Sequence, residues 1–233
     1  MGSLFIASCL MPLTSIFFDL DGTLVDTAPD LINSLNRVRV KANLPEIAHE
    51  LLRPYVSFGS KVLVDQGITE FKDKSRLEEL RLQLLDDYEQ NIAVHSRLFD
   101  GMEQVLQTIE DSELKWGVIT NKPARFTLPL MQRLHLDKRS ACIVSGDTTS
   151  RSKPHPKPML HACELTQSLA KNCLYIGDAA RDIEAGKNAG MQTMAALFGY
   201  ILPDENPNDW NADYQVNHPL KINEWIQQYI LGN

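Results

Sequence analysis

Two carboxylates, Asp19 and Asp21, directly follow the short apolar run Ile16-Phe17-Phe18, and Gly22 comes next. Apolar runs of this kind are typical of a buried strand in a parallel sheet, and residues two apart leave a strand on the same side. Two anions held close together repel each other unless a cation lies between them or they share a proton. Taken alone, the segment favours metal or acid–base chemistry no more than it favours an ordinary Asp-Gly turn.

Polar side chains also end two later apolar runs, and a basic loop follows a third. These side chains are Thr120, Asn121, Asp178 and, in the loop, Lys153. Since the carboxyl ends of parallel strands meet at one edge of a sheet, we expect them to lie close to the two aspartates. Clustered carboxylates without a histidine or cysteine partner suit Mg²⁺. Lys153 and the Thr120 hydroxyl suit an anion beside that ion, most simply a phosphate.

Together, these residue types can hydrolyse a phosphate ester. One aspartate can attack the phosphorus and form an aspartyl-phosphate. The other can donate a proton to the leaving oxygen and later deprotonate the water that hydrolyses the intermediate. Mg²⁺ and Lys153 would screen the repulsion between the nucleophile and the phosphate, which explains why one site needs several acids and one base.

The elements that must position these residues follow from the hydrophobic pattern. Strands and helices alternate from Lys115 onward, which predicts an α/β fold with a doubly wound parallel sheet. Residues 26–95 are almost wholly helical in pattern, which is too much for one crossover. We therefore expect a sheet domain in two pieces, residues 1–25 and 96–233, around a helical domain at residues 26–95. The expected strands are residues 16–18, 115–121, 141–145, 173–178 and 191–197.

The sequence resembles the haloacid dehalogenase superfamily of phosphatases in four motifs that occur in order. They are Asp19-Leu20-Asp21-Gly22-Thr23-Leu24, Thr120-Asn121, Lys153-Pro154 and Gly177-Asp178-Ala179-Ala180-Arg181-Asp182. One such match is weak evidence, whereas four matches, each at a strand end or in the loop after one, are strong evidence. The resemblance implies a Rossmann-like core in which the helical insertion after the first strand is a cap domain.

The resemblance also implies a role for each motif residue. Asp19 is expected to be the nucleophile and Asp21 the general acid and base. Thr120 and Lys153 are expected to hold the phosphoryl group, with help from the backbone of Asn121. Dehalogenases and phosphonate-cleaving relatives differ at the position of Asp21, so its presence favours phosphate-ester hydrolysis.

One Mg²⁺ ion is the cofactor that the resemblance implies. Its expected ligands are the carboxylate of Asp19, the backbone carbonyl of Asp21 and the carboxylate of Asp178. Asp182 is expected to orient either Lys153 or a metal-bound water.

The loop at residues 54–61 resembles the substrate-specificity loop of the phosphoglycolate phosphatase branch. The residues expected to contact the substrate there are Ser57, Gly59, Ser60 and Lys61. Gly59 allows close approach, and Ser60 and the helix start offer hydrogen-bond donors. Arg53 or Lys61 could bind a substrate carboxylate. The alternative is an ordinary helix–loop–helix turn with a serine cap.

The resemblance favours 2-phosphoglycolate as the substrate. The stretch from Phe198 to Leu220 is similar to proteobacterial proteins grouped with phosphoglycolate phosphatase, some of which act instead on N-acetylmuramic acid 6-phosphate. A sugar phosphomutase related to β-phosphoglucomutase would use the same core residues with a longer-lived aspartyl-phosphate. A non-catalytic binding module on the same fold is the third alternative.

The composition limits the other classes of protein. With 233 residues, 43% of them apolar, and a net charge of −7, the chain is an ordinary globular protein without a basic nucleic-acid surface. No apolar run is long enough to span a membrane, and the leader at residues 1–10 lacks the basic start of a signal peptide. Four cysteines without paired spacing fit a reducing compartment. We therefore expect a cytoplasmic monomer or homodimer whose partner is a small phosphorylated acid or sugar.

Overall fold

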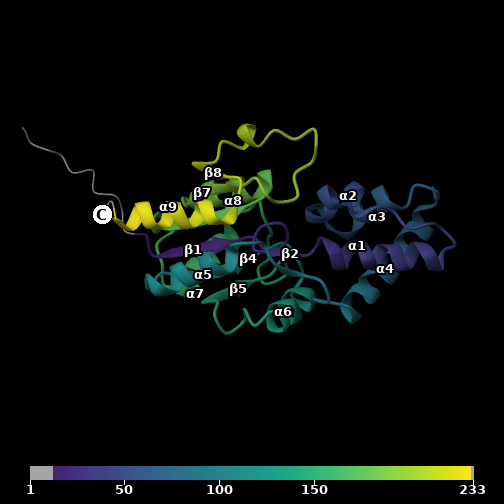
Figure 1. Cartoon of the computed structure of the whole chain (residues 1–233), viewed down its shortest axis with the longest axis horizontal. Coiled ribbons are helices and arrows are strands. Elements are labelled where there is room, and N and C mark those ends of the chain that lie inside the picture. Colours follow the sequence, from purple (N-terminus) through teal and green to yellow (C-terminus); the bar gives the residue numbers. More distant parts are fainter. Residues whose placement is uncertain (1–12, 232–233) are drawn as a thin grey trace, which may run out of the picture.

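The computed structural model describes residues 13–231, and the expected leader at residues 1–10 lies outside that range. Six parallel strands form one sheet in the order β5-β4-β1-β6-β7-β8, with helices on both of its faces (Figure 1). The predicted α/β class and doubly wound parallel sheet are confirmed. The strands are β1 (Ser15–Phe18), β4 (Lys115–Ile119), β5 (Cys142–Val144), β6 (Cys173–Gly177), β7 (Gln192–Ala196) and β8 (Tyr214–Val216).

The described residues also form α-helices and short 3₁₀ helices. Within residues 13–231, none of them combines the length and apolar composition that crossing a lipid bilayer requires. The α-helices are α1 (Ala28–Lys41), α2 (His49–Leu52), α3 (Gly59–Gly67), α4 (Lys74–Gln90), α5 (Met102–Asp111), α6 (Ala124–Arg133), α7 (Lys157–Thr166), α8 (Ala180–Ala189) and α9 (Pro219–Leu231). Three short 3₁₀ helices are η1 (Arg53–Phe58), η2 (Ala170–Asn172) and η3 (Pro207–Trp210).

Strand β1 lies inside the sheet, with β4 on one side and β6 on the other. Its side chains alternate between two apolar clusters. Phe17 packs with residues of α7 and α8, whereas Ile16 and Phe18 pack in the larger cluster that includes α5 and α9. All three are completely buried. A strand that is covered on both faces has no polar alternation, which explains the continuous apolar run in the sequence.

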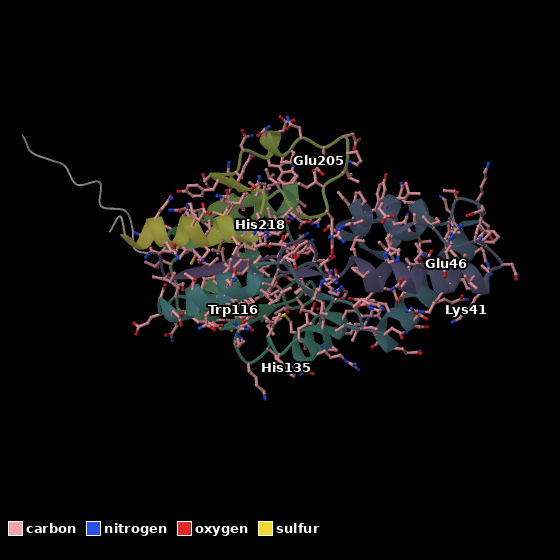
Figure 2. All side chains as sticks on the ribbon, in the orientation of Figure 1. Lys41, Glu46, Trp116, His135, Glu205 and His218 are labelled. Carbon is pink, nitrogen blue, oxygen red and sulfur yellow. The ribbon has the colours of Figure 1, made fainter. Side chains whose placement is uncertain are left out.

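Helices α1 to α4, together with η1, form what we call the helical part, which lies beside the sheet (Figure 1). Helix α1 packs on α4, and α3 packs on α4 and η1. The buried guanidinium of Arg39 donates to the Pro45 carbonyl at 2.7 Å and pairs with Glu70 at 2.9 Å. These contacts compensate the cost of burying its charge. Lys41 and Glu46 lie at the end of the helical part that is farthest from the sheet (Figure 2).

Two elements of the structure are absent from the sequence prediction. Strand β8 is one, because a three-residue strand at the sheet edge, with only Val216 buried, leaves no apolar run to detect. The other is a short antiparallel ribbon in which β2 (Val25–Asp26) pairs with β3 (Arg97–Leu98). This ribbon lies at the expected boundaries of the helical domain, and the division into two domains stays a prediction.

Asp30 connects the start of α1 to the segment that returns to the sheet. Its carboxylate is 2% exposed. It accepts hydrogen bonds from the backbone N–H of His95 at 2.9 Å, from that of Ser96 at 2.8 Å and from the Ser96 hydroxyl at 2.6 Å. A buried donor that loses its acceptor keeps the full cost of its desolvation, so we expect this carboxylate to stabilise the junction.

Replacing Asp30 with alanine should lower the free energy of unfolding by roughly 2–4 kcal/mol, because three donors lose their acceptor. Asp73 offers a matched control, since its carboxylate accepts one exposed hydrogen bond, from the Ser75 N–H at the start of α4. Asp73→Ala should cost about 1 kcal/mol or less. Urea unfolding followed by circular dichroism measures both variants, and equal losses would contradict the role assigned to Asp30.

Candidate active site

The expected nucleophile, Asp19, directly follows β1 at the point where the strand order reverses direction. The chain continues from β1 to β4 and β5 on one side, and then crosses to β6 on the other. The Asp19 N–H donates to the Ile176 carbonyl on β6 at 2.8 Å, and the Leu20 N–H donates to Asp19 Oδ1 at 2.7 Å. These bonds hold the carboxylate in the crevice where open α/β sheets bind ligands.

The ammonium group of Lys153 joins two of the acids. Its Nζ lies 2.8 Å from Asp19 Oδ1 and 2.7 Å from Asp182 Oδ1. It also donates to the Ile119 carbonyl at 3.0 Å and contacts the Tyr175 hydroxyl at 2.9 Å. The side chain of Lys153 is 1% exposed, so its charge is balanced by protein groups rather than by water. Asp182 therefore holds Lys153 beside Asp19.

Asn121 fixes the loop that carries Lys153. Its Nδ2 donates to the Lys153 carbonyl at 3.0 Å, and its Oδ1 accepts from the Lys153 N–H at 2.9 Å. The neighbouring Thr120 is 4% exposed, and its hydroxyl accepts from the Lys122 N–H at 3.1 Å. The sequence predicts a phosphate contact for the Asn121 backbone, and the structure adds this positioning role for the side chain.

The carboxylate of Asp21 has partners that sequence reasoning missed. Its Oδ1 accepts from the Thr27 hydroxyl at 2.5 Å and from Lys122 Nζ at 2.9 Å. Thr27 has the sequence signature of a helix cap, yet its side chain makes no capping hydrogen bond. Lys122 has the signature of an exposed helix start, yet its side chain is 7% exposed. Its position after the second motif is equally compatible with a phosphate contact, but no local signal indicates the pair with Asp21, which lies 101 positions away in the chain.

Tyr88 of α4 covers the Lys122–Asp21 pair from the helical part. Lys122 Nζ lies 4.7 Å from the centroid of the Tyr88 ring, a cation–π contact. Burial alone would lower the pKa of Lys122, but the Asp21 carboxylate and Tyr88 raise it above its ordinary value. Burial also raises the pKa of Tyr88 to about 12. Lys122 therefore stays charged, and the helical part helps to exclude water from the pair.

A cavity of about 450 Å³ lies between the carboxylates and the helical part. Of the residues expected to contact a substrate, Ser57, Gly59 and Ser60 line it, as do Thr120 and Asn121. Lys153 is not among the described lining residues, but its ammonium group contacts Asp19, which lines the cavity. Lys61 is not among the described residues that line the cavity, because its side chain is 79% exposed and pairs with Asp65 on the surface at 2.6 Å. The structure therefore does not bring Lys61 to the site. The cations that do line the cavity are Arg81, Lys122, Arg125 and Arg181.

The haloacid dehalogenase-like hydrolase family matches residues 16–196, a range that contains all four motifs. The chain belongs to this family. It is 41% identical to the N-acetylmuramic acid 6-phosphate phosphatase of Pseudomonas putida, over 95% of this chain and 100% of that protein. It is 39% identical to the phosphoglycolate phosphatase of Xanthomonas campestris, over 89% of this chain and 94% of that protein.

A crystal structure of a predicted phosphoglycolate phosphatase from Haemophilus somnus has the same fold. It matches with a TM-score of 0.81 and 25% identity, and covers 92% of this chain and 98% of that chain. The sequence prediction of a haloacid dehalogenase-type phosphoric monoester hydrolase is confirmed at the level of the family.

The haloacid dehalogenase-like hydrolase family implies a Mg²⁺ ion, and the donor set fits it. Carboxylate oxygens of Asp19, Asp178 and Asp182 lie within 4.8 Å of one another, and all three residues are buried. Burial, followed by the charges of Asp19 and Asp182, raises the pKa of Asp178 to about 7, which marks a cluster short of positive charge. Lys153 contacts both Asp19 and Asp182, but the second oxygen of Asp182 also accepts from the Ala179 N–H, so both oxygens of Asp182 are engaged. Asp19, Asp178 and the Asp21 carbonyl are left as oxygen ligands of the kind that Mg²⁺ prefers.

Gly22 lets the first motif approach Asp178 closely. Its φ is +86°, and a Cβ at this position would lie 2.1 Å from Asp178 Oδ2. Both the left-handed backbone and the lack of space therefore require glycine. The Ser57 hydroxyl contacts both the Asp21 carbonyl, at 3.2 Å, and Asp178 Oδ2, at 3.1 Å, so these two expected ligands lie close together.

Tyr200 is a further residue of the site that sequence reasoning missed. Its N–H donates to Asp178 Oδ2 at 2.8 Å, and its hydroxyl donates to Asp26 Oδ1 at 2.7 Å. The same hydroxyl accepts from the Thr27 N–H at 2.8 Å, at the start of α1. The guanidinium of Arg53, which pairs with Asp26 at 3.0 Å, lies 4.9 Å from the centroid of the Tyr200 ring. Tyr200 thus links an expected metal ligand to the junction with the helical part.

Mg²⁺ should stabilise the folded protein, and more strongly at about pH 8 than at about pH 6, because a proton competes with the ion for Asp178 near its pKa of about 7. Without Mg²⁺, the stability contributed by Asp178 should instead fall as the pH rises. The pKa of Asp178 is raised from its ordinary 3.8, so the folded state binds this proton more tightly than the unfolded state. This group therefore lowers the unfolding free energy as the pH rises from 3.8 to about 7.

Thermal unfolding with and without Mg²⁺ measures both trends. Asp178→Asn should abolish the Mg²⁺ effect and remove this part of the pH dependence. Asp111→Asn, an exposed change at the end of α5, is the matched control and should alter neither. Retention of the full Mg²⁺ effect in Asp178→Asn would show that Asp178 is not a ligand.

Proposed function

We propose that this chain is a Mg²⁺-dependent phosphatase that hydrolyses the phosphate ester of a small sugar acid through an aspartyl-phosphate on Asp19. The observation that supports this most is the cavity of about 450 Å³, since Asp19 and Thr120 line one wall of it and Ser57 and Leu85 line another. The cations around it favour an anionic substrate.

Asp19 is the nucleophile in the proposed reaction. Its Oδ1 is engaged by Lys153 and by the Leu20 N–H, so Oδ2 is the oxygen left to bond to phosphorus as the ester oxygen departs. Lys153 and the Thr120 hydroxyl donate to the phosphoryl oxygens. Mg²⁺ held by Asp19, Asp178 and the Asp21 carbonyl supplies positive charge that offsets the repulsion between the carboxylate and the phosphate.

Asp21 moves the proton. Thr27 and Lys122 both donate to its Oδ1, so Oδ2 carries the proton that is given to the leaving oxygen. In the second half of the reaction the same oxygen takes a proton from the water that attacks the phosphorus. Asp19 is then released with phosphate as the product, and Asp21 is protonated again.

The size of the cavity favours N-acetylmuramic acid 6-phosphate over 2-phosphoglycolate. A space of about 450 Å³ is large enough to enclose a sugar acid, whereas a two-carbon acid would leave most of it to water. Its apolar lining includes Leu31, Leu63 and Leu85, which suit the methyl groups of an acetamido and a lactyl substituent. The Pseudomonas putida relative is named for this substrate. We keep 2-phosphoglycolate as the second candidate, because the Xanthomonas campestris relative is named for it.

Both candidate substrates carry a carboxylate, and Arg125 is the cation we assign to it. Arg125 lies at the start of α6, lines the cavity and makes no ion pair with any residue that the structure describes. The other lining cations have partners, since Arg81 pairs with Glu78 at 2.5 Å and Lys122 with Asp21 at 2.9 Å. The guanidinium of Arg181 donates to the Ser57 carbonyl at 2.8 Å. A guanidinium free to bind a carboxylate with two hydrogen bonds fits this task best.

We also propose a cytoplasmic location. The cysteines that the structure describes, Cys142, Cys163 and Cys173, are free and buried, as expected in a reducing compartment. The oligomeric state, monomer or homodimer, stays a prediction.

With Mg²⁺ present, kcat/KM for phosphate release should be at least about tenfold higher for N-acetylmuramic acid 6-phosphate than for 2-phosphoglycolate, because only the larger substrate uses the whole cavity. Asp19→Asn should lower kcat by at least about 10³-fold with either substrate. Isomerisation of a sugar phosphate faster than phosphate release would instead identify a phosphomutase. If no small phosphoester were hydrolysed, the proposed function would be wrong.

Arg125→Gln should raise KM for substrates with a carboxylate by about tenfold or more, through loss of a charged pair. It should leave hydrolysis of p-nitrophenyl phosphate, which lacks a carboxylate, nearly unchanged. Arg133→Gln, at the exposed far end of the same helix, is the matched control. A similar loss with both kinds of substrate would show that Arg125 does not read the carboxylate.

A further inference from the structure

One hydroxyl of the helical part reaches the carboxylate site beside the sheet. Ser57 Oγ, near the end of η1, lies 3.2 Å from the carbonyl oxygen of Asp21 and 3.1 Å from Asp178 Oδ2. The Asp21 carbonyl and the Asp178 carboxylate are two of the three groups expected to bind Mg²⁺. The sequence predicts a substrate contact for Ser57, whereas its hydroxyl points to the metal site.

The distances fit metal ligation better than hydrogen bonding. A hydroxyl has one proton and cannot serve two acceptors fully, and O–H···O bonds are usually about 2.7–2.8 Å long. In a Mg²⁺ octahedron with ligands at about 2.1 Å, neighbouring ligand oxygens lie about 3.0 Å apart. Ser57 Oγ stands close to that spacing from both Asp21 and Asp178. It also keeps two lone pairs that a cation could use.

We propose that Ser57 Oγ is a ligand of the Mg²⁺ ion, supplied by the helical part at a position that a water would otherwise take. This inference rests on the proposed function, because it needs Mg²⁺ held by Asp19, Asp178 and the Asp21 carbonyl. By linkage, ion binding and the contact of Ser57 with the carboxylate site then favour each other.

The backbone at Ser57 is held independently of its hydroxyl. The guanidinium of Arg181, in the fourth motif, donates to the Ser57 carbonyl at 2.8 Å and lies 5.6 Å from the centroid of the Phe58 ring. Burial alone would lower the pKa of Arg181, but the charges of Asp182, Asp19 and Asp178 raise it, so the guanidinium stays charged. A change of the Ser57 side chain therefore removes the hydroxyl while the main anchors of the loop remain.

Calorimetric titration of the unmodified chain and its variants with Mg²⁺ tests the proposal. Ser57→Ala should weaken Mg²⁺ binding by about tenfold. With Mn²⁺ in place of Mg²⁺, water-proton relaxation should detect one additional exchanging water in this variant. Ser60→Ala is the matched control, because its hydroxyl lines the same cavity but accepts from Arg81 at 3.2 Å instead of contacting the carboxylates. It should bind Mg²⁺ as the unmodified protein does.

Ser57→Cys gives a second test that does not depend on the alanine variant folding. The thiol keeps the shape of serine but offers a soft sulfur, so the preference for Cd²⁺ over Mg²⁺ should rise by about tenfold or more. Unchanged or tighter Mg²⁺ binding in Ser57→Ala, or an unchanged metal preference in Ser57→Cys, would overturn the role of Ser57. If the unmodified protein bound no Mg²⁺ and hydrolysed no phosphoester, the proposed function itself would fail.

Discussion

The site depends on holding three carboxylates, those of Asp19, Asp178 and Asp182, with oxygens within 4.8 Å of one another in a buried place. Like charges in such a place repel strongly, and water is not there to screen them. The fold offsets part of this repulsion with protein groups. Lys153 contacts Asp19 and Asp182 at once, and the Tyr200 N–H binds Asp178. What remains is a shortage of positive charge, and this shortage makes the cluster suitable for a divalent cation and an anionic substrate together.

The sheet and two glycines make this density of charge possible. Phe18 of β1 pairs with Ile176 of β6, and Asp19 and Asp178 each directly follow the end of these adjacent strands. The chain must then pass close to Asp178 twice. A Cβ at Gly22 or at Gly199 would lie about 2 Å from its side chain, at 2.1 and 2.2 Å. A larger residue at either position would displace the Asp178 carboxylate. The position of this carboxylate therefore depends on glycine in both turns.

The sequence was sufficient for the parallel sheet, for its main strands and for the acids, hydroxyl and lysine that follow them, because these signals are local. The order of the strands within the sheet comes from the structure alone. A buried strand is an apolar run, and the residue after it is the residue at the edge of the sheet. Lys122, Thr27 and Tyr200 could not be found in this way. Each has an ordinary local signature. Lys122 and Tyr200 acquire their roles through distant partners, Asp21 and Asp26, whereas Thr27 has the position of a helix cap although its hydroxyl donates to the nearby Asp21. For Lys61 the sequence predicts a substrate contact, because it lies in the loop at residues 54–61, whereas in the structure its side chain faces solvent.

The helical part contacts the sheet side mainly at residues that perform the proposed chemistry. Tyr88 covers Lys122, which holds Asp21, and Ser57 meets Asp21 and Asp178. An ion pair is stronger where water is excluded. Tyr88, by covering Lys122, therefore also strengthens the contact that holds the Asp21 carboxylate in place. In the proposed reaction, a substrate that holds the helical part in this position would therefore improve both the general acid Asp21 and the Mg²⁺ site. A phosphate ester that contacts only the sheet side would improve neither Asp21 nor the Mg²⁺ site. Selectivity then arises in the chemical step as well as in binding, because the surfaces that recognise the leaving group also complete the catalytic site.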